Sequence, residues 1–334
     1  MARFFHHLVW GLMPKKKYIF IYLLLFITLL ICFPLFLVQF FYSQEPKILP
    51  ESPVVSVMAP NGDELQLMLE EYVVGVVAAE MPASFEPEAL KAQAIVARTY
   101  VLMHLPKPVG AADLNQDVTV SSNPGNFQAF ITEEEMKERW HDQADFYLEK
   151  IRTAVYNTYG LVVTYNGEMV TTPYSSTCGG CTEDNADVWG SDLPWLQSVP
   201  CTWDEEAPRY HGEVEMTLKK AAQKLSDATN TNVNAQDIAK MKQVSKTVGG
   251  RVKEVKIGEK SYLGTQLRTA WGLNSTNFCW QVDGSNINFS TIGYGHGVGM
   301  CQYGANGMAK AGKTAQEILA YYYQGIKLTQ RYGE

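Results

Sequence analysis

An apolar stretch without a single charged side chain runs from Tyr18 to Tyr42, directly after the lysines at positions 15–17. About 20 apolar residues suffice to cross the hydrocarbon core of a bilayer, and the basic side of such a segment stays in the cytoplasm. A cleaved signal peptide is the alternative, but its apolar region would cover about 7–15 residues before a small-residue cleavage site, which the residues after Pro34 do not provide. The sequence therefore predicts a cytoplasmic tail at 1–17, a transmembrane anchor at 18–42, a linker at 43–53 and an extracytoplasmic domain at 54–330.

The charge of the chain excludes one class of partner. The 334 residues carry a formal charge of −7, and four of the 28 basic side chains lie within residues 1–17, so the remainder carries −11. Nucleic acid is therefore not expected as a partner, because binding it depends on neutralising phosphates with basic side chains. The predicted outer part is long enough for one large domain or for two lobes.

The segment from Leu69 to Ala79 repeats apolar residues at helical spacing. Pro82 cannot continue such a helix, because proline lacks the backbone N–H that the next turn needs. Glu80 is therefore expected at a helix end. From the residue type alone, a glutamate in this position is more often a solvated helix terminus than a functional group.

A second helix is predicted to begin near Pro87, since proline suits the first turn of a helix. Its apolar side chains share one line, which comprises Leu90, Ala94, Ala97 and Val101. A helix with this much small apolar surface is usually buried. We therefore expect Gln93 and Arg98 to face either a polar cleft or a buried partner.

Turn-forming pairs between apolar runs predict four β-hairpins. They lie at Asn61-Gly62, Asn166-Gly167, Gly249-Gly250 and Asp283-Gly284. Residues 109–128 are predicted to form a loop, and a helix is expected from the capping-box pattern at Thr132 to about Tyr159. Hairpins outnumber any βαβ pattern, so the predicted fold is α+β, with mostly antiparallel hairpins and packed helices.

Two irregular segments are rich in small or turn-forming residues. Residues 173–190 combine hydroxyls and glycines, and residues 293–305 alternate glycines around His296. The second pattern matches neither phosphate-binding glycine motif, so it predicts no nucleotide site. Its glycines indicate tight packing or a backbone that approaches a ligand closely, with His296 either ordering the loop or contacting a ligand.

The cysteines leave three chemistries open. Cys178, Cys181 and Cys201, together with His211, have residue types that suit a tetrahedral zinc ion. Outside the cytoplasm, disulfides such as Cys178–Cys201 and Cys279–Cys301 or free thiols are favoured over zinc. A catalytic thiolate is the least favoured, because no base is fixed beside any of these cysteines by the sequence.

Four segments, in order along the chain, resemble the stage II sporulation protein D family. They are residues 69–82, 89–100, 176–180 and 295–305, and the resemblance extends from about Glu64 to Tyr323. It implies a peptidoglycan lytic transglycosylase in the mother-cell membrane of an endospore-forming bacterium, active during engulfment. It also implies two partners, a cell-wall amidase that strips stem peptides and a membrane scaffold protein, with bare glycan strands as substrate.

The resemblance makes Glu80 the family's catalytic glutamate by position. Breaking the MurNAc–GlcNAc bond requires a proton for the leaving oxygen, which a carboxyl group with a raised pKa can supply. A hydrolase normally needs a second carboxylate. A transglycosylase does not, because the 6-hydroxyl of MurNAc attacks its own anomeric carbon, with Glu80 as acid and base and no cofactor required.

The remaining candidates to bind substrate are polar or aromatic side chains of the matching segments. They are Gln93, Arg98, Tyr174, Ser175, Ser176, Thr177, His296, Gln302 and Tyr303. Arg98 has an alternative role as the structural partner of a carboxylate or a helix end. The related amidase-enhancer proteins share much of the pattern, so a non-enzymatic protein that binds glycan and stimulates an amidase is the alternative function.

Overall fold

The structure is a computed structural model that describes residues 22, 24–26, 28–30, 32–33, 52–59, 62–105, 119–121 and 127–333. The chain divides into two compact units, Met1–Leu49 and Pro50–Glu334. The predicted tail at 1–17 and most of the predicted anchor and linker lie outside the described residues. Within the described part of the chain, no helix has both the length and the apolar character needed to cross a membrane.

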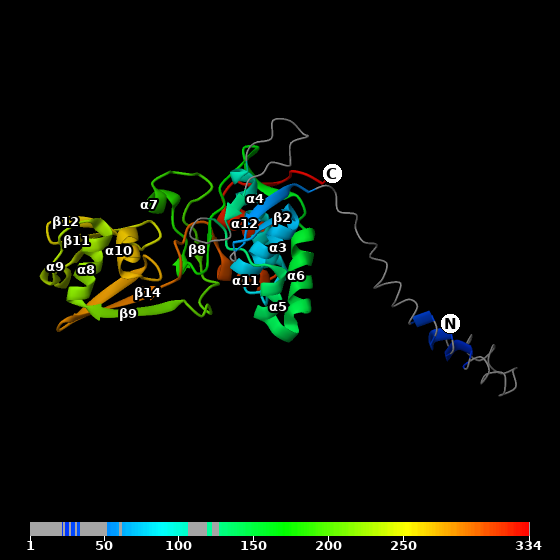
Figure 1. Ribbon diagram of the computed structural model, residues 1–334, viewed down its shortest axis with the longest axis horizontal. Coiled ribbons are helices and arrows are strands. Elements are labelled where there is room, and N and C mark those ends of the chain that lie inside the picture. The colour runs from blue at the N-terminus through cyan, green and yellow to red at the C-terminus, as the bar shows by residue number, and fades with distance from the viewer. Residues whose placement is uncertain are drawn as a thin grey trace, which may run out of the picture. The chain divides into compact units, whose positions relative to one another are not determined.

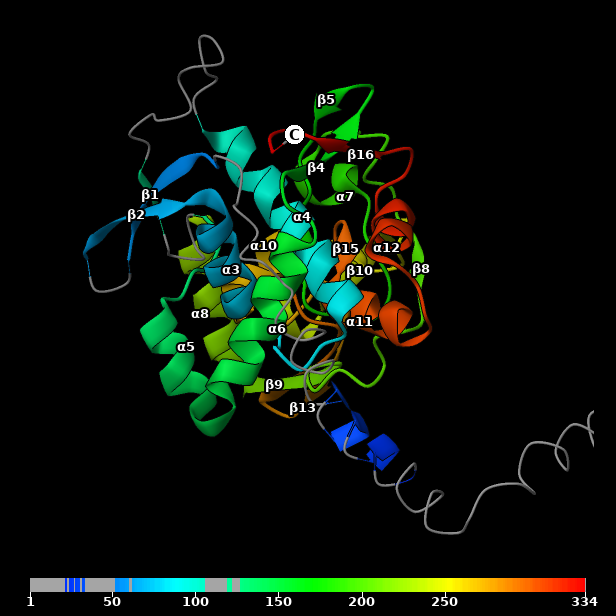
Figure 2. The ribbon, with the colours of Figure 1, turned by 90° about the vertical axis from the view of Figure 1, so that its right-hand side faces the viewer.

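The larger hydrophobic core of the second unit surrounds helix α4 (Pro87–His104). This helix packs against α3, α6, α11, α12 and β4, and Figure 2 shows these elements around it. The elements of this part are β1 (Val54–Met58), β2 (Glu64–Met68), α3 (Leu69–Glu80), β3 (Thr119–Ser121), α5 (Glu133–Trp140), η1 (His141–Gln143), α6 (Ala144–Tyr156), β4 (Leu161–Tyr165), β5 (Glu168–Met169), α11 (Gln302–Lys310), α12 (Ala315–Tyr322) and β16 (Lys327–Gln330).

A second hydrophobic core is formed by one continuous stretch of chain, residues 211–292. Figure 1 shows its elements grouped apart from those around α4. They are β9 (His211–Thr217), α8 (Leu218–Thr229), α9 (Ala235–Ala239), β10 (Lys242–Lys246), β11 (Val252–Ile257), β12 (Lys260–Leu263), α10 (Gly264–Trp271), β13 (Phe278–Asp283) and β14 (Asn286–Ile292).

Short elements connect the two cores. They are β6 (Tyr174–Ser175), β7 (Gly180–Cys181), α7 (Asn185–Trp189), β8 (Pro200–Cys201) and β15 (Met300–Cys301). Strand β15 pairs in parallel with β6, so the glycine-rich loop returns beside residues 174–177. Arg251, which directly precedes β11 of the second core, is buried and donates to the carbonyl of Cys178 at 2.7 Å. The irregular segment at 173–190 is therefore held by contacts from both sides.

The predicted α+β class is confirmed, because helices pack beside small sheets whose ladders are antiparallel except for β1 with β3 and β6 with β15. All four predicted hairpins form. In the second turn, Asn166 and Gly167 have φ values of 52° and 87°, the left-handed values that this turn requires. Asn61 of the first turn lies outside the described residues.

Two predicted elements differ from the structure. The helix expected to continue to about Tyr159 is interrupted at His141, where φ is 49° and the backbone leaves the helix. The chain then resumes as α6 after one turn of 3₁₀ helix. The predicted loop at 109–128 contains β3, which pairs with β1. A three-residue strand that pairs with distant residues has too little local pattern to be predicted.

Candidate functional site

Glu80 is the last residue of α3 and is half-buried. The backbone N–H of Ala129 donates a hydrogen bond to its Oε1 at 2.9 Å. Burial raises the pKa of Glu80, whereas this bond and the hydroxyl of Tyr174 lower it, and the pKa remains above its ordinary value. The carboxyl group therefore stays protonated to a higher pH than an exposed glutamate would.

Gln302 connects the end of α3 to the middle of α4. Its Nε2 lies 3.1 Å from the backbone oxygen of Glu80 and 3.3 Å from Oε1 of Gln93. Both glutamine side chains are buried. The Nε2 of Gln93 and the Oγ of Ser175 are buried atoms without a hydrogen-bond partner among the described residues. Such atoms are rare in proteins and are usually satisfied by an ordered water or a ligand.

Tyr174 lies between Glu80 and a residue that the sequence did not indicate. Its hydroxyl donates to Oε1 of Gln128 at 3.3 Å, and the Nε2 of Gln128 donates to the carbonyl of Ala97 at 3.2 Å. Burial raises the pKa of Tyr174, and the nearby Glu80 raises it further, so the phenol remains protonated. Gln128 is the last residue of the predicted loop and Ala129 directly follows it, and no motif marks either residue.

The pairing of β6 with β15 also brings together the predicted residues 175–177 and Tyr303. The backbone N–H of Tyr303 donates to the carbonyl of Ser176 at 3.1 Å, and the hydroxyls of Ser176 and Thr177 lie 3.3 Å apart. The Tyr303 ring contacts Phe85 edge to face, with 4.9 Å between the ring centroids. Most of the predicted site residues therefore gather at one end of α3.

Arg98 does not belong to this group. Its guanidinium is fully buried and pairs with Glu70, with Nη2–Oε2 and Nε–Oε1 distances of 2.6 and 2.9 Å. It also donates to the carbonyls of Leu161 and Val155. The predicted substrate-binding role of Arg98 is corrected to the structural alternative, because its donors are occupied away from solvent.

His296 orders the glycine-rich loop. Its Nδ1 accepts a hydrogen bond from the backbone N–H of Val298 at 3.1 Å, and its ring lies against Trp189 with 4.9 Å between centroids. Burial, together with the positive charges of Arg268 and Arg251, lowers the pKa of His296 to about 4. The imidazole is therefore neutral at physiological pH, which favours the structural role over a ligand contact.

The cysteines agree with the free-thiol alternative and not with the predicted disulfides. All six cysteines are described and all are free thiols, so neither predicted disulfide is present, and Cys279 is exposed whereas Cys301 is buried. The predicted zinc set is also not assembled. Cys181 contacts the hydroxyl of Ser198 at 3.1 Å, and His211 packs on the Tyr210 ring. Among the described residues, the group that could hold a metal is instead Cys178, Cys201, Asp204 and Cys301.

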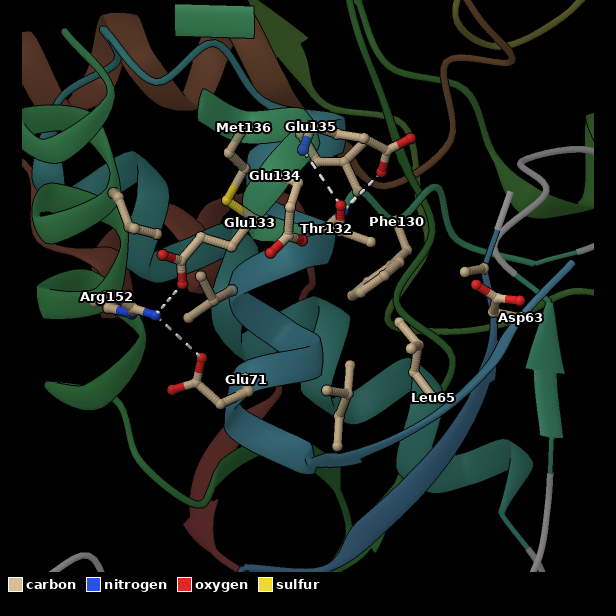
Figure 3. Close-up of a pocket in the computed structure, with 15 residues that line it drawn as sticks. Asp63, Leu65, Glu71, Phe130, Thr132, Glu133, Glu134, Glu135, Met136 and Arg152 are labelled. Carbon is tan, nitrogen blue, oxygen red and sulfur yellow. Dashed lines mark hydrogen bonds and ion pairs between the residues drawn. The ribbon is translucent and has the colours of Figure 1, made fainter. Parts of the chain in front are cut away.

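A cavity of about 630 Å³ lies elsewhere along α3 and does not include Glu80. Its walls carry several carboxylates, and Figure 3 shows Arg152 between Glu71 of α3 and Glu133 of α5. The two nitrogen–oxygen distances are 3.6 and 2.8 Å. Figure 3 also shows the capping box of α5, in which Thr132 and Glu135 exchange hydrogen bonds. Because Glu71 is in the first turn of α3 and Glu80 is its last residue, this cavity is separate from the candidate site.

Comparison with known proteins identifies the family. Residues 64–165 match the family model described as stage II sporulation protein. Stage II sporulation protein D of Bacillus subtilis (strain 168) is 40% identical over 262 residues, which cover 78% of this chain and 74% of that protein. This chain belongs to the stage II sporulation protein D family.

Two other relatives define how far the similarity reaches. Stage II sporulation protein D of Bacillus amyloliquefaciens is 36% identical over 284 residues, covering 84% of this chain and 80% of that protein. A Bacillus subtilis (strain 168) protein named amidase enhancer is 31% identical over an alignment of 304 residues. This alignment covers 76% of this chain but only 40% of the amidase enhancer. The resemblance seen in the sequence is therefore confirmed, including the relation to amidase enhancers. The family model spans Glu80, Gln93, Gln128 and Ala129.

Proposed function

We propose that this chain is a peptidoglycan lytic transglycosylase that cleaves MurNAc–GlcNAc bonds of peptide-free glycan strands and leaves 1,6-anhydro-MurNAc ends. The observation that carries the proposal is the environment of Glu80, a half-buried carboxyl group at a helix end whose pKa is raised by burial. A carboxyl group whose pKa is raised keeps its proton to a higher pH and can donate it to the leaving glycosidic oxygen.

The surroundings of Glu80 favour transglycosylation over hydrolysis. Glycoside hydrolases place two carboxyl groups about 5–9.5 Å apart, and a second negative charge at that distance would raise the pKa of the first. Among the described residues, the pKa of Glu80 is shifted by burial, Ala129 and Tyr174, and none of these contributes a carboxylate. After protonating the leaving oxygen, Glu80 is a carboxylate and can accept the proton of the 6-hydroxyl as that oxygen closes the anhydro ring.

Neighbouring polar groups support binding of a sugar at this place. The partnerless Nε2 of Gln93 and Oγ of Ser175 offer a donor and a hydroxyl. Tyr174, Ser176, Thr177, Gln302 and Tyr303 lie in the segments that pack beside them. We propose that these residues contact the glycan.

The test is an analysis of the products formed by the full-length chain in detergent from peptide-free glycan strands. Mass spectrometry should detect 1,6-anhydro-MurNAc ends. New reducing ends instead of anhydro ends would show that the chain is a hydrolase. A second candidate function, stimulation of a cell-wall amidase without glycan cleavage, is favoured by the similarity to the amidase enhancer. It would be indicated if no glycan is cut but an added amidase releases stem peptides faster.

Replacing Tyr174 with Phe should move the alkaline limb of the pH–rate profile to higher pH. The Tyr174 hydroxyl stabilises the charged form of Glu80 and so lowers its pKa. Removing that hydroxyl raises the pKa, and the acid form then persists to higher pH. Cleavage rates between pH 4 and 9, about the range over which a perturbed glutamate titrates, measure this shift.

Tyr321→Phe is the matched control, because the Tyr321 hydroxyl donates to the carbonyl of Pro200 and does not touch Glu80. Its alkaline limb should coincide with that of the unmodified protein. A limb that moves to lower pH in Tyr174→Phe would contradict the assignment of Glu80 as the acid.

The location and partners of the chain form the last part of the proposal. We propose that residues 18–42 anchor it in the mother-cell membrane during engulfment, with the catalytic domain outside the cytoplasm. In this setting, a cell-wall amidase would supply peptide-free strands, and a membrane scaffold protein would hold the two enzymes together. Support comes from the charge-free run at 18–42 and from the family relatives, which are named for sporulation and for amidase enhancement.

A further inference from the structure

Three cysteines and one aspartate meet in the interior, beside the candidate site. The sulfur atoms of Cys178, Cys201 and Cys301 and a carboxylate oxygen of Asp204 all lie within 4.8 Å of one another. All four side chains are at most 1% exposed. Cys178 lies three residues after β6, and Cys201 and Cys301 are the last residues of β8 and β15. Asp204 follows β8 by three residues.

The carboxylate of Asp204 lacks a counter-charge. Its Oδ2 accepts from the backbone N–H of Gly179 at 2.8 Å and lies 3.1 and 3.4 Å from the sulfurs of Cys178 and Cys301. Its Oδ1 is buried without a hydrogen-bond partner. In the described part of the chain, no ion pair joins Asp204 to a Lys, Arg or His. A buried carboxylate is costly unless it is paired or binds a metal.

Hydrogen-bond donors from outside the cluster surround two of its sulfur atoms, and such donors stabilise the thiolate form of a cysteine. The backbone N–H groups of Cys178 and Gly304 donate to the sulfur of Cys301 at 3.2 and 3.3 Å. The hydroxyl of Tyr322 lies 3.2 Å from the sulfur of Cys201. Hydrogen bonds from an outer shell to ligating atoms are a regular feature of metal sites, because they orient the ligands and stabilise their charged forms.

We propose that Cys178, Cys201, Asp204 and Cys301 form a four-coordinate structural zinc site. Thiolate and carboxylate ligands bind Zn²⁺ at about 2.3 and 2.0–2.2 Å, which places sulfurs of a tetrahedron about 3.8 Å apart. The observed spacing of these atoms is compatible with closure around one ion. Calcium and magnesium do not suit the site, because they prefer oxygen ligands and three of the four atoms are sulfurs.

The proposed ion would fix the position of Gln302 relative to Glu80. Cys301 directly precedes Gln302, whose side chain contacts the backbone oxygen of Glu80. A metal bound to Cys301 and to Cys201 would fasten the start of α11 to β8. The role of these four residues is therefore positioning. With all four ligand positions filled by protein, the ion would have no open position for substrate.

The test is the zinc content of the full-length chain, purified in detergent with reductant and without added metal. Native mass spectrometry and elemental analysis should find about one zinc per chain. Cys301→Ser and Asp204→Asn should lose it, whereas Cys181→Ser and Cys279→Ser should keep it. Cys181 belongs to the zinc set predicted from the sequence, so this pair of results separates the two sets. Tyr322→Phe should weaken zinc binding by about 10–100-fold.

A second measurement, alkylation of the cysteines, uses the unmodified protein and therefore does not depend on whether the variants fold. In the unmodified protein, Cys178, Cys201 and Cys301 should resist alkylation until a chelator removes the metal and should then react together. The proposal is overturned if the native protein holds no zinc and takes up none from a zinc buffer while its thiols are intact. It is equally overturned by a Cys178–Cys201 disulfide in the native protein, by zinc that stays in Cys301→Ser but leaves Cys181→Ser, or by alkylation that does not depend on the chelator.

Discussion

Replacing Glu80 with Gln is expected to slow cleavage of peptide-free glycan strands by about 10²–10⁴-fold, the usual contribution of a positioned general acid. The amide has nearly the same shape, and its oxygen can still accept the hydrogen bond from the Ala129 N–H that Oε1 of Glu80 accepts. It cannot, however, supply the proton for the leaving oxygen. The rate at which 1,6-anhydro-MurNAc ends appear is the measurement.

Glu71→Gln is the matched control, since it removes one negative charge from the same helix at its other end. Glu71 accepts from the Tyr156 hydroxyl and lies 3.6 Å from Arg152. The Glu71→Gln variant should cleave glycan at a rate within about two-fold of that of the unmodified protein, because partly exposed ion pairs contribute little to stability. Equal losses in the two variants would mean that Glu80 acts through overall charge or folding. Unchanged cleavage in Glu80→Gln would remove Glu80 from the reaction.

The sequence predicted those parts of the fold that depend on local backbone preferences. Pro82 and Pro87 determine where α3 ends and where α4 begins, because proline restricts the backbone directly. The turn at Asn166 and Gly167 is likewise local. His141, by contrast, interrupts a helical pattern with a left-handed conformation that its residue type does not require. The helical repeat of apolar residues alone does not predict such a break.

In the candidate site, too, the features that depend on neighbouring residues could be predicted, whereas those that depend on distant residues could not. Glu80 could be placed at a helix end from its neighbours in sequence, and four motifs indicate the family. Its hydrogen-bond donor at Ala129 is 49 residues away and contributes a backbone group, for which no side chain gives a signal. Asp204 was missed for a similar reason. It contacts Cys301, which lies 97 residues further along the chain, and the residues of the second core lie between the two in sequence.

Replacing Arg98 with Met should lower the free energy of unfolding by about 3–5 kcal/mol, because removal of one partner leaves an unpaired buried charge. The change leaves the carboxylate of Glu70 at 1% exposure without its cation. The carbonyls of Leu161 and Val155 also lose donors. Urea unfolding followed by circular dichroism measures this loss.

Two comparisons distinguish a structural role of Arg98 from a substrate contact. Arg152→Met removes an arginine from a partly exposed ion pair and should cost at most about 1 kcal/mol. The double variant Glu70→Leu with Arg98→Met removes both charges together and should recover most of the stability lost in the single variant. This double variant should also bind peptide-free glycan strands as tightly as the unmodified protein. A double variant that is stable but has lost glycan affinity would return Arg98 to the binding site, since only a contact with substrate would then explain the loss.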